Sequence, residues 1–143
     1  MSDIVTAVSF AFKLVIAEDD SAEADMLKRA WHRQGRRVVV PCWFACEVRN
    51  ALHQKVRSGL ITERAAADFV RIALNRVTVL DPDPGIAVCG IQIASQLRQR
   101  ASYDAQYLAL AERHGCELWT ADRRFALTAQ PDFPFVHWLG QAA

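Results

Sequence analysis

The sequence predicts an α/β three-layer sandwich, in which a short, mainly parallel central sheet is flanked by helices on both faces. Short apolar runs rich in β-branched residues alternate with longer segments of helical periodicity along the whole chain. The 143 residues match the length of one ordinary domain, and no linker, repeat or low-complexity segment divides them. We therefore expect residues 1–143 to form a single domain of this class.

The first elements come from the apolar N-terminal stretch. Residues 4–6 (IVT) are typical of a short buried strand, and the segment from Ser9 onward predicts a turn into a helix. A second helix is expected within residues 19–35, where Ser21 is a candidate cap. Residues 36–41 (RRVVVP) follow as a strand. Three side chains supply the apolar face of the second helix: Met26, Leu27 and Trp31.

The same alternation continues to the end of the chain. Helical periodicity predicts further helices over residues 43–58, 62–75, 86–100, 102–115 and 123–129. Strands are expected within residues 76–85, where a Pro-rich turn follows the strand, and within residues 116–122 and 135–139. In such a fold, functional groups gather just past the carboxyl ends of the parallel strands.

Composition excludes several classes of protein. Hydrophobic residues make up 52% of the chain and charged residues 23%, which is typical of neither disordered nor membrane proteins. The formal net charge is +1, so any contact with nucleic acid would need a local basic patch. The apolar run over residues 4–17 has no basic segment before it, contains Lys13, and is too short to span a bilayer. We expect it to fold into a cytoplasmic domain without a membrane contact.

The four cysteines favour the same compartment. Cys42, Cys46, Cys89 and Cys116 lie in apolar or helical surroundings, which is typical of reduced thiols in a cytosolic protein. Cys42 and Cys46 could share a helix face, with Cys116 and His114 as further zinc ligands. No second C-x-x-C pair accompanies them, so small buried side chains are the preferred interpretation.

Three acidic residues stand where functional groups are expected. Glu47 lies in the first turns of the helix after the second predicted strand, Asp104 starts a long apolar helix, and Asp122 follows the strand LWTA directly. Each alone has an ordinary interpretation as a cap, a partner of the helix dipole or part of a surface ion pair. Together, three carboxylates at one sheet edge repel one another unless a cation holds them. Mg²⁺ or Mn²⁺ is the usual cation in phosphate chemistry.

Three successive stretches resemble PIN-domain ribonucleases, specifically the VapC-type toxins of bacterial toxin–antitoxin pairs. They are VPCWFACEVRNAL, RSGLITERAAADF and SYDAQYLALAERHGCELWTADRRF, and the resemblance extends over essentially the whole chain. It implies a metal-dependent endoribonuclease in which acids bind Mg²⁺ or Mn²⁺ and activate a water for attack on an RNA phosphodiester. Carried over by position, Glu47, Asp104 and Asp122 would bind the metal. Supporting polar groups would be Ser9, Asn50 and Thr120.

The resemblance also implies partners. Toxins of this family are usually homodimers, and each is blocked by a cognate antitoxin whose tail inserts into the acidic groove. Arg123 and Arg124 follow Asp122 directly and could contact RNA phosphates or an antitoxin carboxylate, or they could be solvated helix residues. Three tryptophans are expected in the core rather than as platforms on which bases stack: Trp43, Trp119 and Trp138.

One family position is filled by a different residue. The family has Asp after the first strand, in the pattern V-D-A-S-x-A-x-K, whereas this chain has TAVSFAFK. Aligning Ser9, Ala11 and Lys13 with the pattern puts Ala7 where the acid should be. Asp3 cannot replace it, because it lies four strand positions earlier, about 13 Å away at the usual rise. We expect a weakened or inactive enzyme, and the sequence leaves open whether Ala7 is natural or introduced.

Two alternatives stay open. A non-catalytic PIN-like module that binds RNA or an antitoxin without cutting is favoured by Ala7, because a metal cluster that loses a ligand holds its cation less tightly. A receiver-like signalling domain is suggested by Glu18, Asp19 and Asp20. A receiver also needs a phospho-accepting Asp after a mid-chain strand and a late Lys, and no lysine follows Lys55. The acidic run is therefore interpreted as a solvated helix start.

Overall fold

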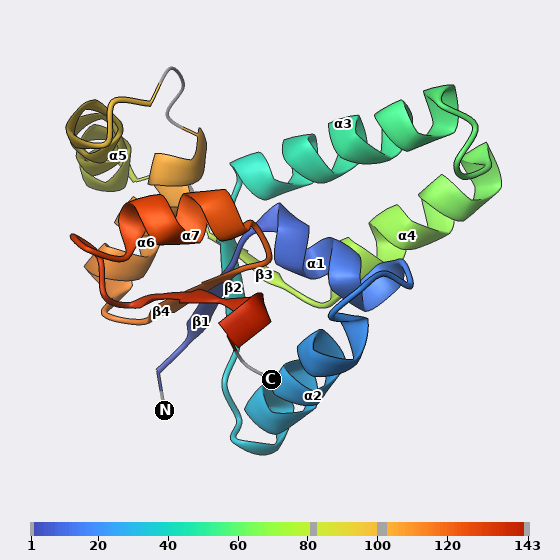
Figure 1. Ribbon diagram of the computed structural model, residues 1–143, viewed down its shortest axis with the longest axis horizontal. Coiled ribbons are helices and arrows are strands. Elements are labelled where there is room, and N and C mark those ends of the chain that lie inside the picture. The colour runs from blue at the N-terminus through green and yellow to red at the C-terminus, as the bar shows by residue number, and fades with distance from the viewer. Residues whose placement is uncertain (1, 81–82, 100–102, 142–143) are drawn as a thin grey trace.

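The computed structural model describes residues 2–80, 83–99 and 103–141. Five short strands form one sheet, in the order β3-β2-β1-β4-β5 (Figure 1). All four neighbouring pairs are parallel, so the predicted α/β sandwich with a parallel sheet is confirmed. The strands are β1 (Ile4–Thr6), β2 (Val38–Pro41), β3 (Thr78–Leu80), β4 (Glu117–Thr120) and β5 (Val136–Trp138).

Helices connect the strands, and their order follows the predicted alternation. They are α1 (Val8–Val15), α2 (Ser21–Arg33), α3 (Trp43–Arg57), α4 (Glu63–Asn75), α5 (Pro84–Gln96), α6 (Tyr103–His114) and α7 (Arg123–Ala129), followed by the 3-10 turn η1 (Leu139–Gln141). None of the helices in the described ranges is both long enough and apolar enough to cross a membrane. The predicted helix ends at residues 100 and 102 fall outside the described part of the chain.

Strand β1 is at the centre of the sheet, and later strands are added on both sides of it. Through α1 to α4 the chain runs to β2 and β3 at one edge, and through α5 to α7 it returns to β4 and β5 at the other. Right-handed crossovers put these two groups of helices on opposite faces, and Figure 1 shows α2 and α6 on opposite sides of the strands. Open α/β sheets bind ligands where the strand order reverses, which here is the carboxyl end of β1.

The core is continuous across the sheet. Most side chains of β1 and β2, and alternate side chains of β4, are buried, which is typical of parallel strands covered on both faces. From one face, α6 packs on β1, β2 and β4. The strand residues with no exposed surface include Ile4, Val5, Val39, Val40 and Leu118.

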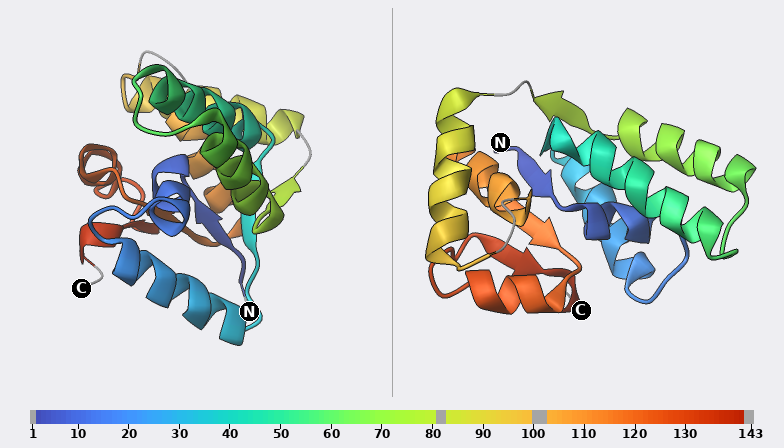
Figure 2. Two further views of the ribbon diagram at one scale, coloured as in Figure 1. Left: turned by 90° about the vertical axis from the view of Figure 1, so that its right-hand side faces the viewer. Right: turned by 90° about the horizontal axis from the view of Figure 1, so that it is seen from above.

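Helices α3 and α4 pack against each other and project beyond the sheet (Figures 1 and 2). Because this hairpin has less protein around it, Ala73 is the one fully buried residue within α4, and its other core-facing side chains are half-buried: Ala66, Phe69, Val70 and Leu74. The start of α3 remains close to the sheet, since Phe44 and Val48 are fully buried. The projecting hairpin therefore begins at the carboxyl edge of the sheet.

Two local expectations are wrong. Met26 is 69% exposed, because α2 turns Trp31 rather than Met26 toward the core. The predicted Pro-rich turn after β3 is partly the first turn of α5, which begins at Pro84. Asp83 caps this helix by accepting a hydrogen bond from the Gly85 N–H at 2.7 Å. Proline suits the first helical position because its missing N–H has no partner to lose there.

Candidate active site at the carboxyl edge of the sheet

Ala7 lies at the centre of the carboxyl edge, directly after β1. Its N–H donates to the carbonyl of Trp119 at 3.0 Å, and its backbone (φ −74°, ψ 164°) is that of the N-cap of α1. An N-cap with extended backbone favours Asp or Ser, whose side-chain oxygen accepts a free N–H of the first helical turn. The methyl group of Ala7 offers no such acceptor. The backbone at residue 7 would therefore accommodate the aspartate that the sequence pattern predicts there.

Glu47 lies on the second turn of α3, which follows the neighbouring strand β2. Its carboxylate is half-buried, and the Tyr107 hydroxyl donates a hydrogen bond of 2.8 Å to Oε1. Burial raises the pKa of Glu47, the bond from Tyr107 lowers it, and the charge of Asp104 raises it again, with a net increase. Tyr107 is 1% exposed, and burial beside Glu47 raises its own pKa, so it remains protonated and acts as the donor.

Asp104 is the acid between the other two. It is the second residue of α6, and although much of its surface is exposed, partial burial of its carboxyl group raises its pKa, as does the charge of Asp122. Asp122 caps α7 by accepting a hydrogen bond from the Phe125 N–H at 3.1 Å. Asp104 in turn raises the pKa of Glu47, so its charge is felt by one acid and it feels the charge of the other.

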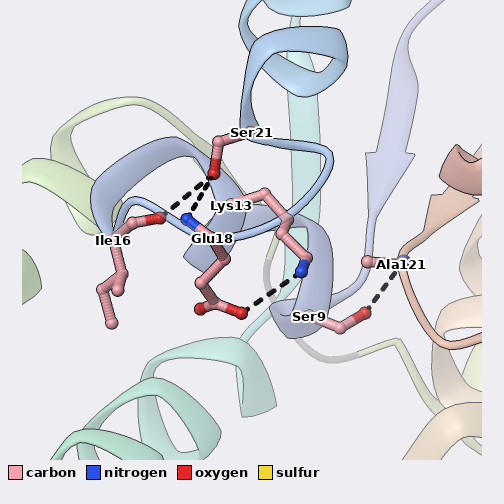
Figure 3. Close-up of polar contacts among 6 residues, drawn as sticks. All are labelled: Ser9, Lys13, Ile16, Glu18, Ser21 and Ala121. Atoms are coloured by element: carbon pink, nitrogen blue, oxygen red, sulfur yellow. Dashed lines mark hydrogen bonds and ion pairs between the residues drawn. The ribbon is translucent and has the colours of Figure 1, made fainter. Parts of the chain in front are cut away.

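Ser9 and Thr120 hold the turn that carries Asp122. Figure 3 shows the Ser9 Oγ of α1 accepting a hydrogen bond from the Ala121 N–H, at 3.1 Å. The Thr120 Oγ1, which has no exposed surface, accepts one from the Asp122 N–H at 3.0 Å and lies 3.2 Å from Ser9 Oγ. The two hydroxyls therefore fasten the end of β4 to the start of α1, beside Ala7.

The acids are divided between two neighbouring hollows. Glu47 lines one together with Asn50, an exposed residue, and Val8. Asp104 and Asp122 line the other, whose remaining lining residues are Gln99, Arg124, Phe125 and Thr128. The two arginines after Asp122 differ in position: Arg124 lies beside the acids, whereas the guanidinium of Arg123 lies over the Trp138 ring, 5.6 Å from its centroid.

The carboxylate oxygens of Glu47, Asp104 and Asp122 are ligands of the kind that hard divalent cations prefer, and all three residues lie at the carboxyl edge of the sheet. Mg²⁺ commonly uses one or two carboxylates and takes its other ligands from water and phosphate. Among the residues described, however, no group of three or more His, Cys, Asp or Glu side chains is compact enough to hold a metal ion. Ala7, at the end of β1 on the same edge of the sheet, carries a methyl group and adds no carboxylate to Glu47, Asp104 and Asp122. The residues thus fit the ion but do not form a closed cage.

Three residues near the acids have positions that the sequence did not predict. Tyr107 is buried and bonded to Glu47, and its spacing of three residues from Asp104, which puts both on one helix face, is the signal that could have found it. Trp43 was expected in the core, but it is 37% exposed and stacks on Tyr103. Gln99 carries a buried Oε1 without a hydrogen-bond partner in the described chain, and no sequence signal marks it.

The other two predicted tryptophans are half-buried against the core, as expected. Trp119 stacks on His137 with ring centroids 4.9 Å apart and packs against Trp31 at 5.9 Å. Trp138 lies against the core beneath Arg123. These rings stabilise the β4–β5 side of the sheet.

The zinc alternative is inconsistent with the fold. Cys42 follows β2 at the carboxyl edge of the sheet, and Cys46 lies one turn along α3. Cys116 and His114 precede β4 and so lie at the opposite edge, because the strands are parallel. Cys116 is buried there, and burial raises the pKa of its thiol to about 11. The two pairs therefore cannot share one ion.

The acidic run proposed for a receiver domain has a structural role. Glu18, Asp19 and Asp20 are exposed in the connection between α1 and α2. Glu18 forms an ion pair of 3.2 Å with Lys13, and its N–H donates to the Ser21 Oγ, as Figure 3 shows. Ser21 was expected to cap α2, but it is the first helical residue and Asp20 is the N-cap, with no side-chain hydrogen bond to the helix. The Ser21 hydroxyl accepts from the Glu18 N–H and donates to the carbonyl of Ile16, directly after α1.

Comparisons with known proteins agree with this geometry. The PIN domain family model matches residues 8–131. PAE2754 from Pyrobaculum aerophilum has a similar crystal structure, with a TM-score of 0.67 and 24% identity, covering 89% of this chain and 79% of that chain. The crystal structure of VapC20 from Mycobacterium tuberculosis, a sarcin-ricin loop cleaving toxin, is also similar. Its TM-score is 0.64 and its sequence identity 20%, over 92% of this chain and 96% of that chain. No curated protein matches significantly. Because the family model spans most of the sequence, the chain belongs to the PIN domain family, whose members are typically nucleases.

Proposed function

We propose that this protein is a VapC-type toxin: a divalent-metal-dependent endoribonuclease that cleaves RNA phosphodiester bonds, weakened or inactive because Ala7 replaces an aspartate. Membership of the PIN domain family supports the nuclease class. The shared fold with VapC20, a toxin that cleaves the sarcin-ricin loop, supports the choice of RNA. The proposal treats residues 1–143 as one functional domain.

A single observation carries this proposal. Glu47, Asp104 and Asp122 follow strands or begin helices at the carboxyl edge of the sheet, and Asp104 and Asp122 line one hollow. The charge of Asp104 accordingly raises the pKa of Glu47, and that of Asp122 raises the pKa of Asp104. Like charges gathered without a cationic partner destabilise a fold, and active sites are a common reason for such an arrangement. Ala7 ends the central strand β1 at the same edge of the sheet.

Glu47, Asp104 and Asp122 would hold Mg²⁺ or Mn²⁺, which supplies a bound water of lowered pKa and neutralises charge on the phosphate. Tyr107 fixes the orientation of Glu47 through its hydroxyl, at 2.8 Å. Ser9 and Thr120 act as positioning residues, because they fasten the turn from which Asp122 projects. Asn50 lines the hollow of Glu47 and would contact the substrate there.

Replacement of the aspartate by Ala7 has two consequences. It removes one carboxylate from the centre of the site, so a cation has fewer ligands and catalysis by its bound water falls. It also removes the N-cap of α1, since no side chain caps this helix in the structure. A cap of this kind contributes about 1 kcal/mol to stability. Both losses act at the same residue.

We further propose the partners that the family resemblance implies. RNA is the substrate, a cognate antitoxin occupies the acidic groove, and the toxin acts as a cytoplasmic homodimer. Arg124 lines the hollow of Asp104 and Asp122 and is therefore placed to pair with an RNA phosphate or an antitoxin carboxylate. Arg123 covers Trp138 instead and is the weaker candidate for this contact.

A second candidate function is a non-catalytic PIN-like module that binds RNA or an antitoxin without cutting. Two observations favour it: Ala7 lacks a carboxylate, and the described residues contain no compact group of three potential metal ligands. The nuclease and the binding module have the same fold. They differ in whether an aspartate at residue 7 restores RNA cleavage.

RNA cleavage by the parent chain and by Ala7→Asp separates the two. With Mg²⁺ and a panel of structured RNAs, we expect Ala7→Asp to cleave and the parent chain to cleave far more slowly or not at all. The double variant Ala7→Asp with Asp104→Asn is the matched control, and it should lose the activity. If no variant cleaves and Ala7→Asp binds no divalent ion, the nuclease function is wrong and the binding module stands.

A further inference from the structure

Two exposed aromatic rings lie in parallel contact beside the acids. Trp43 and Tyr103 stack with their centroids 4.7 Å apart and an angle of 4° between the rings. They nevertheless remain 37% and 50% exposed. Large aromatic side chains are normally buried for most of their area, so a solvent-facing pair with fixed geometry is unusual as a device for stability alone.

The position of this pair links it to the candidate site. Trp43 is the first residue of α3 and Glu47 lies one turn further, so both are on one face of the helix. Tyr103 is the first residue of α6 and directly precedes Asp104. Both rings line the hollow that contains Glu47 and Asn50. The stack thus joins the two helix starts that carry acids of the site.

The same pair also borders a second hollow, of about 350 Å³. Its lining is mostly apolar, with Leu80 and Ile86 from the neighbouring elements, and Gln106 adds an amide. The aromatic pair therefore stands between the hollow of Glu47 and a mostly apolar hollow, at whose border Asp83 lies. A nucleotide has the same division, because its phosphate is charged while its base is a flat ring with polar edges.

We propose that Trp43 and Tyr103 form a stacking platform for a nucleobase of single-stranded RNA, beside the acids of the candidate site. This inference rests on the proposed function, since it takes RNA as the ligand of the site. A base placed on the platform continues the parallel stack that the two rings already form. Gln106, which lines the adjoining apolar hollow, is positioned to contact an edge of the base.

Charge favours this kind of binding. The site is acidic and the formal net charge of the chain is only +1, so attraction to phosphates supplies little affinity. Base stacking on aromatic side chains requires no positive charge and accepts every base, because each base has a flat face. It would hold RNA at a site whose carboxylates repel the backbone. A preformed stack also reduces the conformational entropy lost on binding.

Binding to single-stranded RNA in EDTA tests the platform without any cleavage. The probes are oligoadenylate and a strand of the same length with abasic residues throughout, measured by fluorescence anisotropy. We expect Trp43→Ala to bind oligoadenylate about 5- to 100-fold more weakly, the range for loss of one stacking ring. Trp43→Leu, which keeps apolar bulk for folding, should show a similar loss, and Trp43→Phe a smaller one. None should change the binding of the abasic strand.

Leu60→Ala is the control for a general surface effect, because Leu60 is 73% exposed in the turn between α3 and α4. It should bind oligoadenylate like the parent. If Trp43→Leu and the parent bind oligoadenylate equally well, the platform is wrong, and the exposed pair would be explained by contact with a protein partner instead. Equal losses on both strands, or no binding by the parent, would also overturn the platform. Cleavage by Ala7→Asp is scored separately, so platform and nuclease function can fail independently.

Discussion

Tyr107→Phe removes one hydroxyl and tests how the fold holds Glu47. The hydroxyl donates to Oε1 at 2.8 Å from a ring that is 1% exposed, so the phenylalanine fits the same space. A hydrogen bond to an ionised group contributes about 1.5–3 kcal/mol. Glu47 is only half-buried, and water can replace part of the lost bond. We expect the free energy of unfolding near pH 8 to fall by about 1.5 kcal/mol, the lower end of this range.

The loss should depend on pH, and its sign follows from the pKa of Glu47. In the folded protein this pKa lies above its ordinary value of 4.5, and the bond from Tyr107 opposes the increase. Without the bond the pKa rises further, so the folded variant retains its proton while the unfolded chain loses it. Stability then falls, relative to the parent, as pH rises from the raised pKa of Glu47 in the parent through its still higher pKa in the variant. Near pH 4 the loss should be about 0.5 kcal/mol, that of a neutral hydrogen bond.

Urea denaturation followed by circular dichroism at both pH values measures this difference. Tyr103→Phe is the matched control, because it removes a hydroxyl from a residue that is 50% exposed and should change stability by less than about 0.5 kcal/mol. If Tyr107→Phe destabilises no more than Tyr103→Phe, the hydroxyl does not hold Glu47. A loss of equal size at pH 4 and pH 8 would show that Glu47 is not the group concerned.

Two further predictions concern the rest of the site. Ser9→Ala removes the acceptor of the Ala121 N–H. We expect the free energy of unfolding to fall by about 1 kcal/mol and hydrogen exchange at Ala121 to become faster. Unchanged exchange would show that Ser9 does not fasten this turn. Asp104→Asn removes a negative charge that repels the carboxylate of Glu47 and raises its pKa. Without divalent ions, the variant should therefore be more stable than the parent by a few tenths of a kcal/mol, about the size of the interaction between two exposed charges. This gain should be present near pH 7 and vanish near pH 4, and a destabilising effect at pH 7 would contradict the repulsion.

Much of the fold could be predicted from short-range signals. The strands are runs such as Val38–Pro41, in which β-branched residues are buried on both faces. Caps such as Thr62, which accepts a hydrogen bond from the Ala65 N–H at 3.1 Å, mark the helix starts in the sequence itself. Met26 could not be predicted correctly, because helical periodicity leaves the orientation of an apolar stripe open by a few tens of degrees and tertiary packing decides it.

Less of the candidate site than of the fold could be predicted from the sequence. The topological rule for parallel sheets leads to Glu47, Asp104 and Asp122 at strand ends, and the structure has them at that edge; their role stays a prediction. The contact of Trp43 with Tyr103 joins residues sixty positions apart and depends on how two helices meet, which no local pattern encodes. The division of the acids between two hollows is likewise a consequence of packing.

Binding of Mn²⁺ to the parent chain and to Ala7→Asp, measured by isothermal titration calorimetry without RNA, tests the central claim most directly. That claim is that the acids at the carboxyl edge form a divalent metal site whose missing ligand belongs at residue 7. We predict at least about tenfold tighter binding by Ala7→Asp, corresponding to about 1.4 kcal/mol, and loss of this gain when Asp104→Asn is added. Equal affinity of the parent and Ala7→Asp, or a gain that survives Asp104→Asn, would contradict the account.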